Sequence, residues 1–187
     1  MSYLNTIEYR ILPRHAYKIQ RNCSGCKGKS NYINTGNFRV NANGNRIDVW
    51  LIYQCEKCRH TYNLTVHERI KPTEIPEENY KRFLANDAEL AFEYGMDKAL
   101  LARNKAFISD EDMEYELQKV TSDEAVLYNG NVRQHADKFT EIKIILQNSY
   151  EIKIRSDKLV SEILQISRSK AKKMLDIGSI KIVQVNK

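Results

Sequence analysis

The chain lacks any long apolar segment and any recognisable export signal. No apolar run among its 187 residues approaches the ~20 residues that a membrane-spanning helix needs. The first residues carry Glu8, Arg10 and Arg14, and no apolar stretch there is followed by a small-residue cleavage site. These absences predict a cytoplasmic protein that does not contact a membrane.

The sequence also lacks the residue arrangements of a catalytic site. We find no paired nucleophile and base, no glycine-rich phosphate loop and no metal site with an open coordination position. We therefore expect no enzymatic activity and no small-molecule substrate. Charged residues make up 29% of the chain and the apolar fraction is ordinary, which predicts a folded globular protein rather than a disordered one.

Charge is unevenly distributed along the chain. Residues 1–72 carry a net charge of +8 (12 Lys/Arg against 4 Asp/Glu), residues 73–124 carry −8 (6 against 14), and residues 151–187 carry +5 (9 against 4). Two basic ends around an acidic middle are typical of proteins that bind a polyanion. Ordinary solvated charge explains the pattern equally well.

Cysteine occurs only four times, in two Cys-x-x-Cys pairs. Four thiolates form the closed tetrahedral shell of a structural zinc site, with no open position for catalysis. We predict one structural Zn²⁺ bound by Cys23, Cys26, Cys55 and Cys58. An iron–sulfur cluster, two disulfides and a dithiol redox centre are the alternatives. His60 and His67 are interpreted as surface or strand residues rather than ligands.

The 28 residues between the two cysteine pairs predict an additional pair of strands. Residues 38–40 and 47–54 flank Asn43-Gly44, a strong hairpin signal, and apolar residues alternate with polar ones along 47–54. Alternation resumes over residues 62–66, after the second cysteine pair. The pattern predicts an antiparallel zinc ribbon whose second cysteine turn lies at a hairpin tip.

The acidic middle is predicted to be helical. Pro76-Glu77-Glu78 indicates a helix start, apolar residues recur at helical spacing from Tyr80 to Ala91, and Gly95 offers a stop. A second short helix is expected over residues 96–101. A third, capped within residues 109–112, would carry Met113, Leu117 and Val120.

The C-terminal residues predict a hairpin, two helices and a strand. Residues 141–146 and 150–155 alternate around a polar turn. A first helix would then bury Leu159, Ile163 and Leu164. A second would be capped by Ser167 and ended by Gly178, before a strand over residues 180–185.

Four cations crowd the start of that second helix: Arg168, Lys170, Lys172 and Lys173. The helix dipole disfavours each exposed cation there by about 0.3–1 kcal/mol. A bound phosphate would reverse the sign, because the exposed N–H groups and the cations both attract it. A short helix kept soluble by lysines is an equally good reading of the charge alone.

This C-terminal segment resembles an S4-type RNA-binding module. Its Arg-x-Asp-x-x-Leu opening is matched at 155–159, its Ser-Arg-x-x-Ala helix at 167–171 and its Gly-x-Ile-x-Ile strand at 178–182. After residue 182 the chain departs from the module, which usually continues with Asn-Gly and further strands. The resemblance implies that structured RNA would be contacted by Arg155, Arg168, Lys170, Lys172 and Lys173.

The whole chain also resembles a bacterial family of unknown function, of the DUF1062 type. The runs at residues 38–43, 48–55 and 99–104 carry this likeness, which implies one shared architecture and no activity.

Taken together, the sequence predicts an α+β protein with three parts. These are a zinc-ribbon domain over 1–72, an acidic helical segment over 73–125, and a β-hairpin with a small S4-like αα-plus-strand module over 126–187. The expected function is RNA binding, of the ribosome- or tRNA-associated kind. The alternative is a protein-interaction adaptor that uses the zinc ribbon or the acidic helices to bind a protein partner.

Overall fold

The structure of the chain, a computed structural model, describes residues 5–109, 113–120 and 142–185. It divides into two compact units, one of residues 15–113 and the other of residues 1–14 together with 114–187. Each unit combines a sheet with helices, so the predicted α+β class is confirmed. None of the helices in the described ranges is long and apolar enough to cross a membrane.

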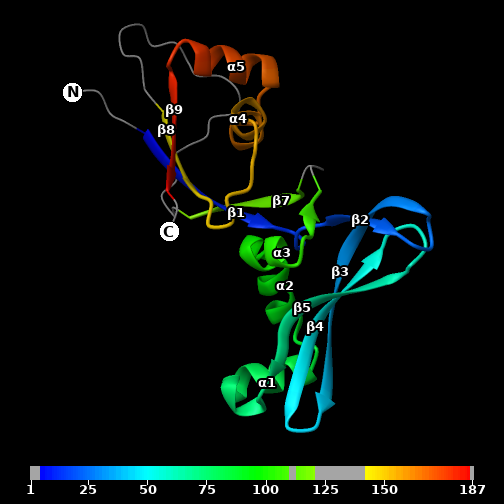
Figure 1. Ribbon diagram of the computed structural model, residues 1–187. Coiled ribbons are helices and arrows are strands. Elements are labelled where there is room, and N and C mark those ends of the chain that lie inside the picture. The colour runs from blue at the N-terminus through cyan, green and yellow to red at the C-terminus, as the bar shows by residue number, and fades with distance from the viewer. Residues whose placement is uncertain (1–4, 110–112, 121–141, 186–187) are drawn as a thin grey trace, which may run out of the picture. The chain divides into compact units, whose positions relative to one another are not determined.

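The unit of residues 15–113 is built on an antiparallel sheet of strand order β5-β4-β3-β2-β6 (Figure 1). Along β4 every second side chain is buried, which is the alternation expected of a strand with one covered face. The predicted hairpin at Asn43-Gly44 is confirmed, with Gly44 at a φ of +63°. The strands are β2 (Ile19–Cys23), β3 (Gly28–Asn43), β4 (Arg46–Cys55), β5 (Thr61–Ile70) and β6 (Phe107–Ile108).

The acidic middle folds as short helices of this same unit. They are the 3₁₀ turn η1 (Pro72–Glu74), α1 (Glu77–Leu84), α2 (Ala88–Met96) and α3 (Lys98–Arg103). The helix expected to run from Pro76 to Gly95 is instead broken at Asn86, whose φ of +53° cannot continue a right-handed helix. Asp87 then caps α2 by accepting the Leu90 N–H at 2.8 Å. The second short helix was predicted correctly, as α3.

Gly95 allows α2 to lie close to the sheet. It lies inside the helix rather than after it, and it is buried. A Cβ at this position would lie 2.5 Å from Asn34 Nδ2 and 2.6 Å from the Ala16 Cβ. The same Asn34 amide donates to the Ala91 carbonyl at 2.7 Å, so the missing side chain preserves a hydrogen bond between helix and strand.

The other unit contains a four-stranded sheet of order β7-β1-β8-β9. β1 pairs antiparallel with β7, whereas β8 lies between β1 and β9 and pairs parallel with both. Apolar side chains of β1, β8 and β9 form its core with those of the helices: Ile7, Ile11, Ile144, Leu146, Leu159, Val160, Ile163, Ala171 and Ile180. The strands are β1 (Asn5–Pro13), β7 (Tyr115–Lys119), β8 (Ile142–Gln147) and β9 (Ile180–Val185).

Two predictions about this unit are wrong. The expected third helix with Leu117 and Val120 is instead the strand β7, which hydrogen-bonds along β1. Of its expected cap at 109–112, only Ser109 lies within the described residues. The expected hairpin over 141–155 does not form, because both edges of β8 are taken by β1 and β9. The chain turns at Asn148 instead, whose side chain accepts the Ile152 N–H and donates to the Ile152 carbonyl.

The two predicted C-terminal helices are present between β8 and β9. They are α4 (Ser156–Leu164) and α5 (Arg168–Asp176), which pack against each other. The Ser167 hydroxyl accepts the Lys170 N–H at 3.3 Å, as expected of an N-cap. Gly178 follows α5 at a φ of +73°, and the chain then enters β9.

The division into units differs from the predicted boundaries at residues 72 and 125. Helices α1 and α2 contact β3, so the acidic segment belongs to the unit that carries the cysteines. β1 belongs to the C-terminal unit because it pairs with β7 and β8, more than 100 residues away in sequence.

Candidate metal centre and basic helix

Two turns at one end of the antiparallel sheet bring the four cysteines together. Cys23 ends β2 and Cys55 ends β4, and each is followed by a tight turn that carries the second cysteine of its pair. Pairing of Tyr32 on β3 with Cys55 on β4 aligns the two turns. The four Sγ atoms all lie within 4.8 Å of one another.

The spacing of the sulfur atoms fits one metal ion. Cys23 Sγ lies 3.4 Å from Cys58 Sγ, and Cys26 Sγ lies 3.8 Å from Cys55 Sγ. A tetrahedral ion with metal–sulfur bonds near 2.3 Å places its ligands about 3.8 Å apart. A disulfide needs about 2.05 Å, and the cysteines are unbridged. The predicted ligand set therefore converges as a metal site requires.

Gly25 is the residue that lets the first turn approach the second. A Cβ there would lie 2.9 Å from Cys58 Sγ and 3.8 Å from Cys23 Sγ. Gly28, at the start of β3, would meet no atom within 4 Å if it carried a Cβ. Of these two glycines, only Gly25 is sterically required by the cluster.

Hydrogen bonds within the cluster shift the pKa values of Cys23 and Cys58 in opposite directions. The Tyr32 hydroxyl donates to the Cys23 sulfur and lowers the pKa of that thiol to about 6. The backbone N–H of His60 lowers the pKa of Cys58. Hydrogen bonds of Cys58 with the sulfurs of Cys23 and Cys26 outweigh this effect and raise the pKa of Cys58 to about 12. Burial, followed by the bond to Cys23, raises the pKa of Tyr32. Metal binding requires thiolates, so a bound cation would have to displace the proton that Cys58 retains.

A line of aromatic and cationic contacts supports Tyr32. Its ring meets that of Tyr62 edge to face, with centroids 6.5 Å apart, and the Arg21 guanidinium lies 3.5 Å from the Tyr62 centroid. Sequence reasoning missed Tyr32 and Arg21, because their roles depend on which strands are neighbours. His60 contacts the Ser24 hydroxyl and His67 packs on Phe83, so neither belongs to the cysteine cluster.

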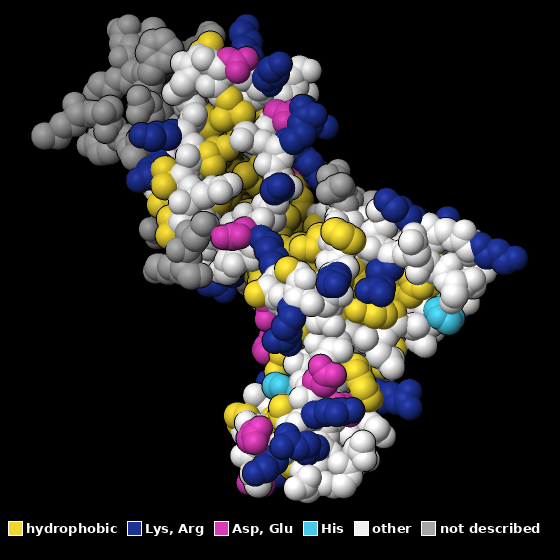
Figure 2. Space-filling model, viewed as in Figure 1, with side chains coloured by type: hydrophobic (Ala, Val, Ile, Leu, Met, Phe, Trp, Pro, Cys, Tyr) yellow, Lys and Arg dark blue, Asp and Glu magenta, His cyan; other side chains and the backbone are white. Residues whose placement is uncertain are grey.

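The predicted RNA-contacting residues lie at the start of α4 and along α5. Lys and Arg side chains gather over α5 in the space-filling view (Figure 2). All five residues are exposed: Arg155, Arg168, Lys170, Lys172 and Lys173. The structure joins the two arginines through one carboxylate and leaves the three lysines on the outside of α5.

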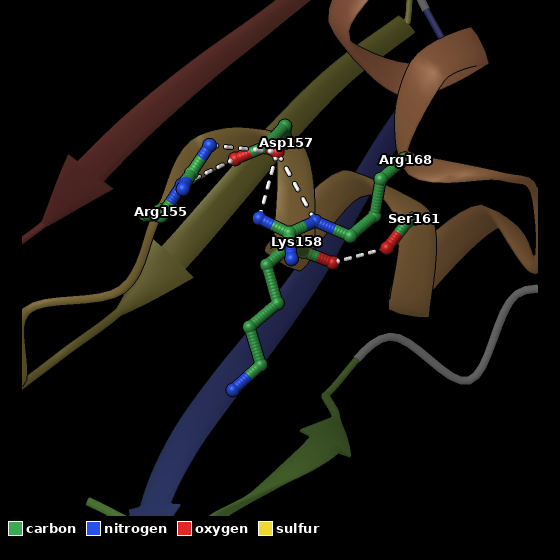
Figure 3. A network of polar contacts seen from close by, with 5 residues as sticks. All are labelled: Arg155, Asp157, Lys158, Ser161 and Arg168. Atoms are coloured by element: carbon green, nitrogen blue, oxygen red, sulfur yellow. Dashed lines mark hydrogen bonds and ion pairs between the residues drawn. The ribbon is translucent and has the colours of Figure 1, made fainter. Parts of the chain in front are cut away.

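Asp157 holds Arg155 and Arg168 together (Figure 3). Its Oδ2 accepts from Arg168 Nη2 at 2.9 Å and Nε at 3.1 Å, and its Oδ1 accepts from Arg155 Nε at 3.1 Å. Asp157 is only 16% exposed, whereas the arginines are 76% and 52% exposed. Burial raises the pKa of Asp157, but the bonds from Arg168 and Arg155 outweigh it and lower the pKa overall. One carboxylate thus orients two outward-facing guanidinium groups.

The cations of α5 fall on two sides of the helix. At about 100° per residue, Arg168 and Lys172 lie one turn apart on one side, and Lys170 and Lys173 lie together on the other. Ala171, which is buried, separates them on the inner face. Because Arg168 is bound to Asp157 and through it to Arg155, the Arg168–Lys172 side continues into the start of α4.

Comparison with known proteins identifies the family but adds no relative of known activity. No curated protein and no solved structure matches this chain. One family model, described as "Protein of unknown function (DUF1062)", matches residues 40–186, a range that includes Cys55 and Cys58 and the whole basic helix. Because the match covers most of the sequence, the chain belongs to the DUF1062 family.

Proposed function

We propose that this chain is a zinc-stabilised RNA-binding protein, with a closed zinc ribbon as its platform and an S4-like helix pair that contacts structured RNA. The observation that carries the proposal is the basic surface of α5 and its link to α4. Five exposed cations gather there, and no acidic residue occupies the first turn of α5. Cations of this kind bind phosphates of the RNA backbone, which dominate affinity.

Zinc is the proposed ion because of the donor set. Four thiolates in a tetrahedral arrangement select zinc or an iron–sulfur cluster. The turns enclose the cluster closely, since a single Cβ at Gly25 would already touch Cys58 Sγ. Four protein ligands fill the tetrahedral shell and leave no coordination position for a reacting water. The proposed zinc therefore stabilises the fold and takes part in no reaction.

Metal analysis tests this assignment directly. Protein purified without a chelator should contain about one zinc per chain and neither iron nor acid-labile sulfide. Removal of the zinc should unfold the unit of residues 15–113, because ligand binding and folding are coupled in such sites. Circular dichroism during chelation would measure this. Much less than one zinc per chain, or stoichiometric iron, would refute the assignment.

RNA binding is best tested through the three lysines of α5. Arg155 and Arg168 are poor test residues, because their removal would also expose the partly buried Asp157. Lys170, Lys172 and Lys173 are exposed, and the triple change to Gln removes three charges from the surface of the helix. A control of equal charge change is Lys57, Lys71 and Lys81 to Gln, all exposed residues of the other unit.

We expect wild-type protein to bind transfer RNA or an RNA stem-loop with strong salt dependence. The α5 variant should bind about 10- to 100-fold more weakly, and its slope of log K against log salt should fall by about 2–3, one per lost phosphate contact. The control should match wild type. Unchanged affinity and slope in the α5 variant would refute the proposal. A partner protein recovered after nuclease treatment, and lost on changing the acidic helices, would favour the adaptor alternative.

A further inference from the structure

A basic cleft lies at the edge of the antiparallel sheet, in the unit of residues 15–113. β6 is only two residues long and pairs with Ile19 and Gln20, so the next residues of β2, 21–23, have no strand partner on that side within the described chain. A cleft of about 720 Å³ opens here. It is lined by Gln20, Arg21, Asn22, Lys29, Asn104, Lys105, Phe107 and Ile108.

The electrostatic character of this cleft is one-sided. Three of its lining residues are cations and none is a carboxylate. Lys29 and Lys105 are exposed, and neither forms an ion pair with any residue in the described ranges. Arg21 lies against the Tyr62 ring and forms no ion pair with an acid in the described part of the chain. Field lines from like charges in a concave site reinforce one another, so the cleft attracts an anion.

The cleft also presents an aromatic ring to solvent. Phe107 is 73% exposed, the most exposed large apolar side chain among the described residues. It is a strand residue, paired with Gln20, so its backbone is fixed while its ring stays outside the core. Figure 2 shows an apolar patch bordered by Lys and Arg side chains over β6 and β2. A fixed, exposed ring beside unpaired cations suits a planar ligand that carries negative charge.

We propose that this cleft binds a nucleotide unit, with the base stacked on Phe107 and its phosphate held by Lys29 and Lys105. The side-chain amides of Gln20 and Asn22 supply donors and acceptors for a base edge. The Asn104 amide, by contrast, is already bound to Thr65 and Leu100. The volume lies within the roughly 300–1,000 Å³ range of small-ligand sites. The unit is supplied either by single-stranded RNA or by a free nucleotide. This site is separate from the one proposed on α5 and stands on the cleft alone.

The test uses the full zinc-loaded chain and three probes: a labelled oligouridylate, a labelled oligoadenylate and uridine monophosphate. Phe107→Ala should weaken oligonucleotide binding by about 10-fold or more, because stacking on an aromatic ring is lost. Phe107→Trp should bind within a few-fold of wild type, and base stacking should quench its added fluorescence beside the single native tryptophan. Lys29→Gln/Lys105→Gln should weaken binding and lower the salt slope by about 1–2.

Two controls separate this site from α5 and from general charge. Lys57→Gln/Lys81→Gln, with the same charge change in the same unit, should leave binding unchanged. The α5 lysine variant should lose affinity for the stem-loop but keep its Phe107-dependent binding of the oligouridylate. If the monophosphate binds as tightly as the oligomers, the cleft takes a free nucleotide; if the oligomers bind at least 10-fold tighter, it takes single-stranded RNA. Equal affinity of wild type and Phe107→Ala, or no saturable binding of any probe, would overturn the proposal.

Discussion

Replacing Gly25 by Ala tests whether the cysteine cluster is as closed as its geometry indicates. The added Cβ would lie 2.9 Å from Cys58 Sγ, against the roughly 3.5–4.0 Å of an ordinary contact. Cys58 must therefore move by about 0.6 Å or more. Metal–ligand distances tolerate only about 0.2 Å, so the sulfur cannot move this far and keep its bond unchanged.

We expect Gly25→Ala to lower metal affinity by about 10- to 100-fold, the range found when the surroundings of a metal ligand are disturbed. At a fixed excess of metal, this corresponds to about 1.4–2.7 kcal/mol of lost folding stability. Competition with a chromogenic chelator measures the affinity, and thermal unfolding with metal present measures the stability.

Gly28→Ala is the matched control for this substitution. It makes the same chemical change three residues later, at a position without a positive φ and with no atom within 4 Å of the added Cβ. Both variants gain the same restriction of the unfolded chain, so their difference isolates the collision with sulfur. If Gly25→Ala binds metal as tightly as Gly28→Ala and wild type, the cluster is looser than the structure indicates and the reasoning is wrong.

Three further predictions concern packing, charge and the hydroxyl beside the cluster. Gly95→Ala should destabilise the chain by about 1–3 kcal/mol in chemical denaturation, although alanine is the better helix former, because the added Cβ collides with buried neighbours. Because the pKa of Asp157 is lowered in the folded state, its contribution is present above about pH 4 and is lost as pH falls through its folded pKa; the Tm difference between wild type and Asp157→Asn should therefore shrink from pH 6 to pH 3. Persistence of that difference at pH 3 would show that Arg168 and its carboxylate partner do not stabilise the fold through charge. Tyr32→Phe removes the hydroxyl that donates to Cys23 and should weaken metal binding by about 10-fold without unfolding the loaded protein, as chelator competition and circular dichroism would show.

Local signals predicted the parts of the fold that depend on neighbours in sequence. Asn43-Gly44 specifies a tight turn, and the alternation along β4 specifies which face is buried. Ser167 caps α5 through a bond that spans three residues. Asp87 and Asp97 give the same kind of signal for α2 and α3, and reading them as caps would have divided the acidic middle correctly.

The wrong predictions fall where a distant segment decides the local structure. Residues 115–119 have an apolar spacing that permits a helix, but β1 offers an unpaired edge and the segment pairs with it as β7. Likewise, the pattern of residues 150–155 permits a strand. The edge of β8 with which it would pair is instead occupied by β9, formed by residues 180–185. Propensity over five or six residues is small beside a row of backbone hydrogen bonds.

The sequence by itself determined the four ligands of the candidate metal site and the cations of α5, because cysteine pairs and charge are visible in the order of residues. Only the tertiary structure decided that Tyr32 hydrogen-bonds to Cys23 and that Asp157 joins two arginines. It also decided that Phe107 lines a cleft with three cations and no carboxylate. Each of these depends on contacts between strands or helices that are distant in sequence. Such contacts are set by the packing of the whole unit and leave no local signal.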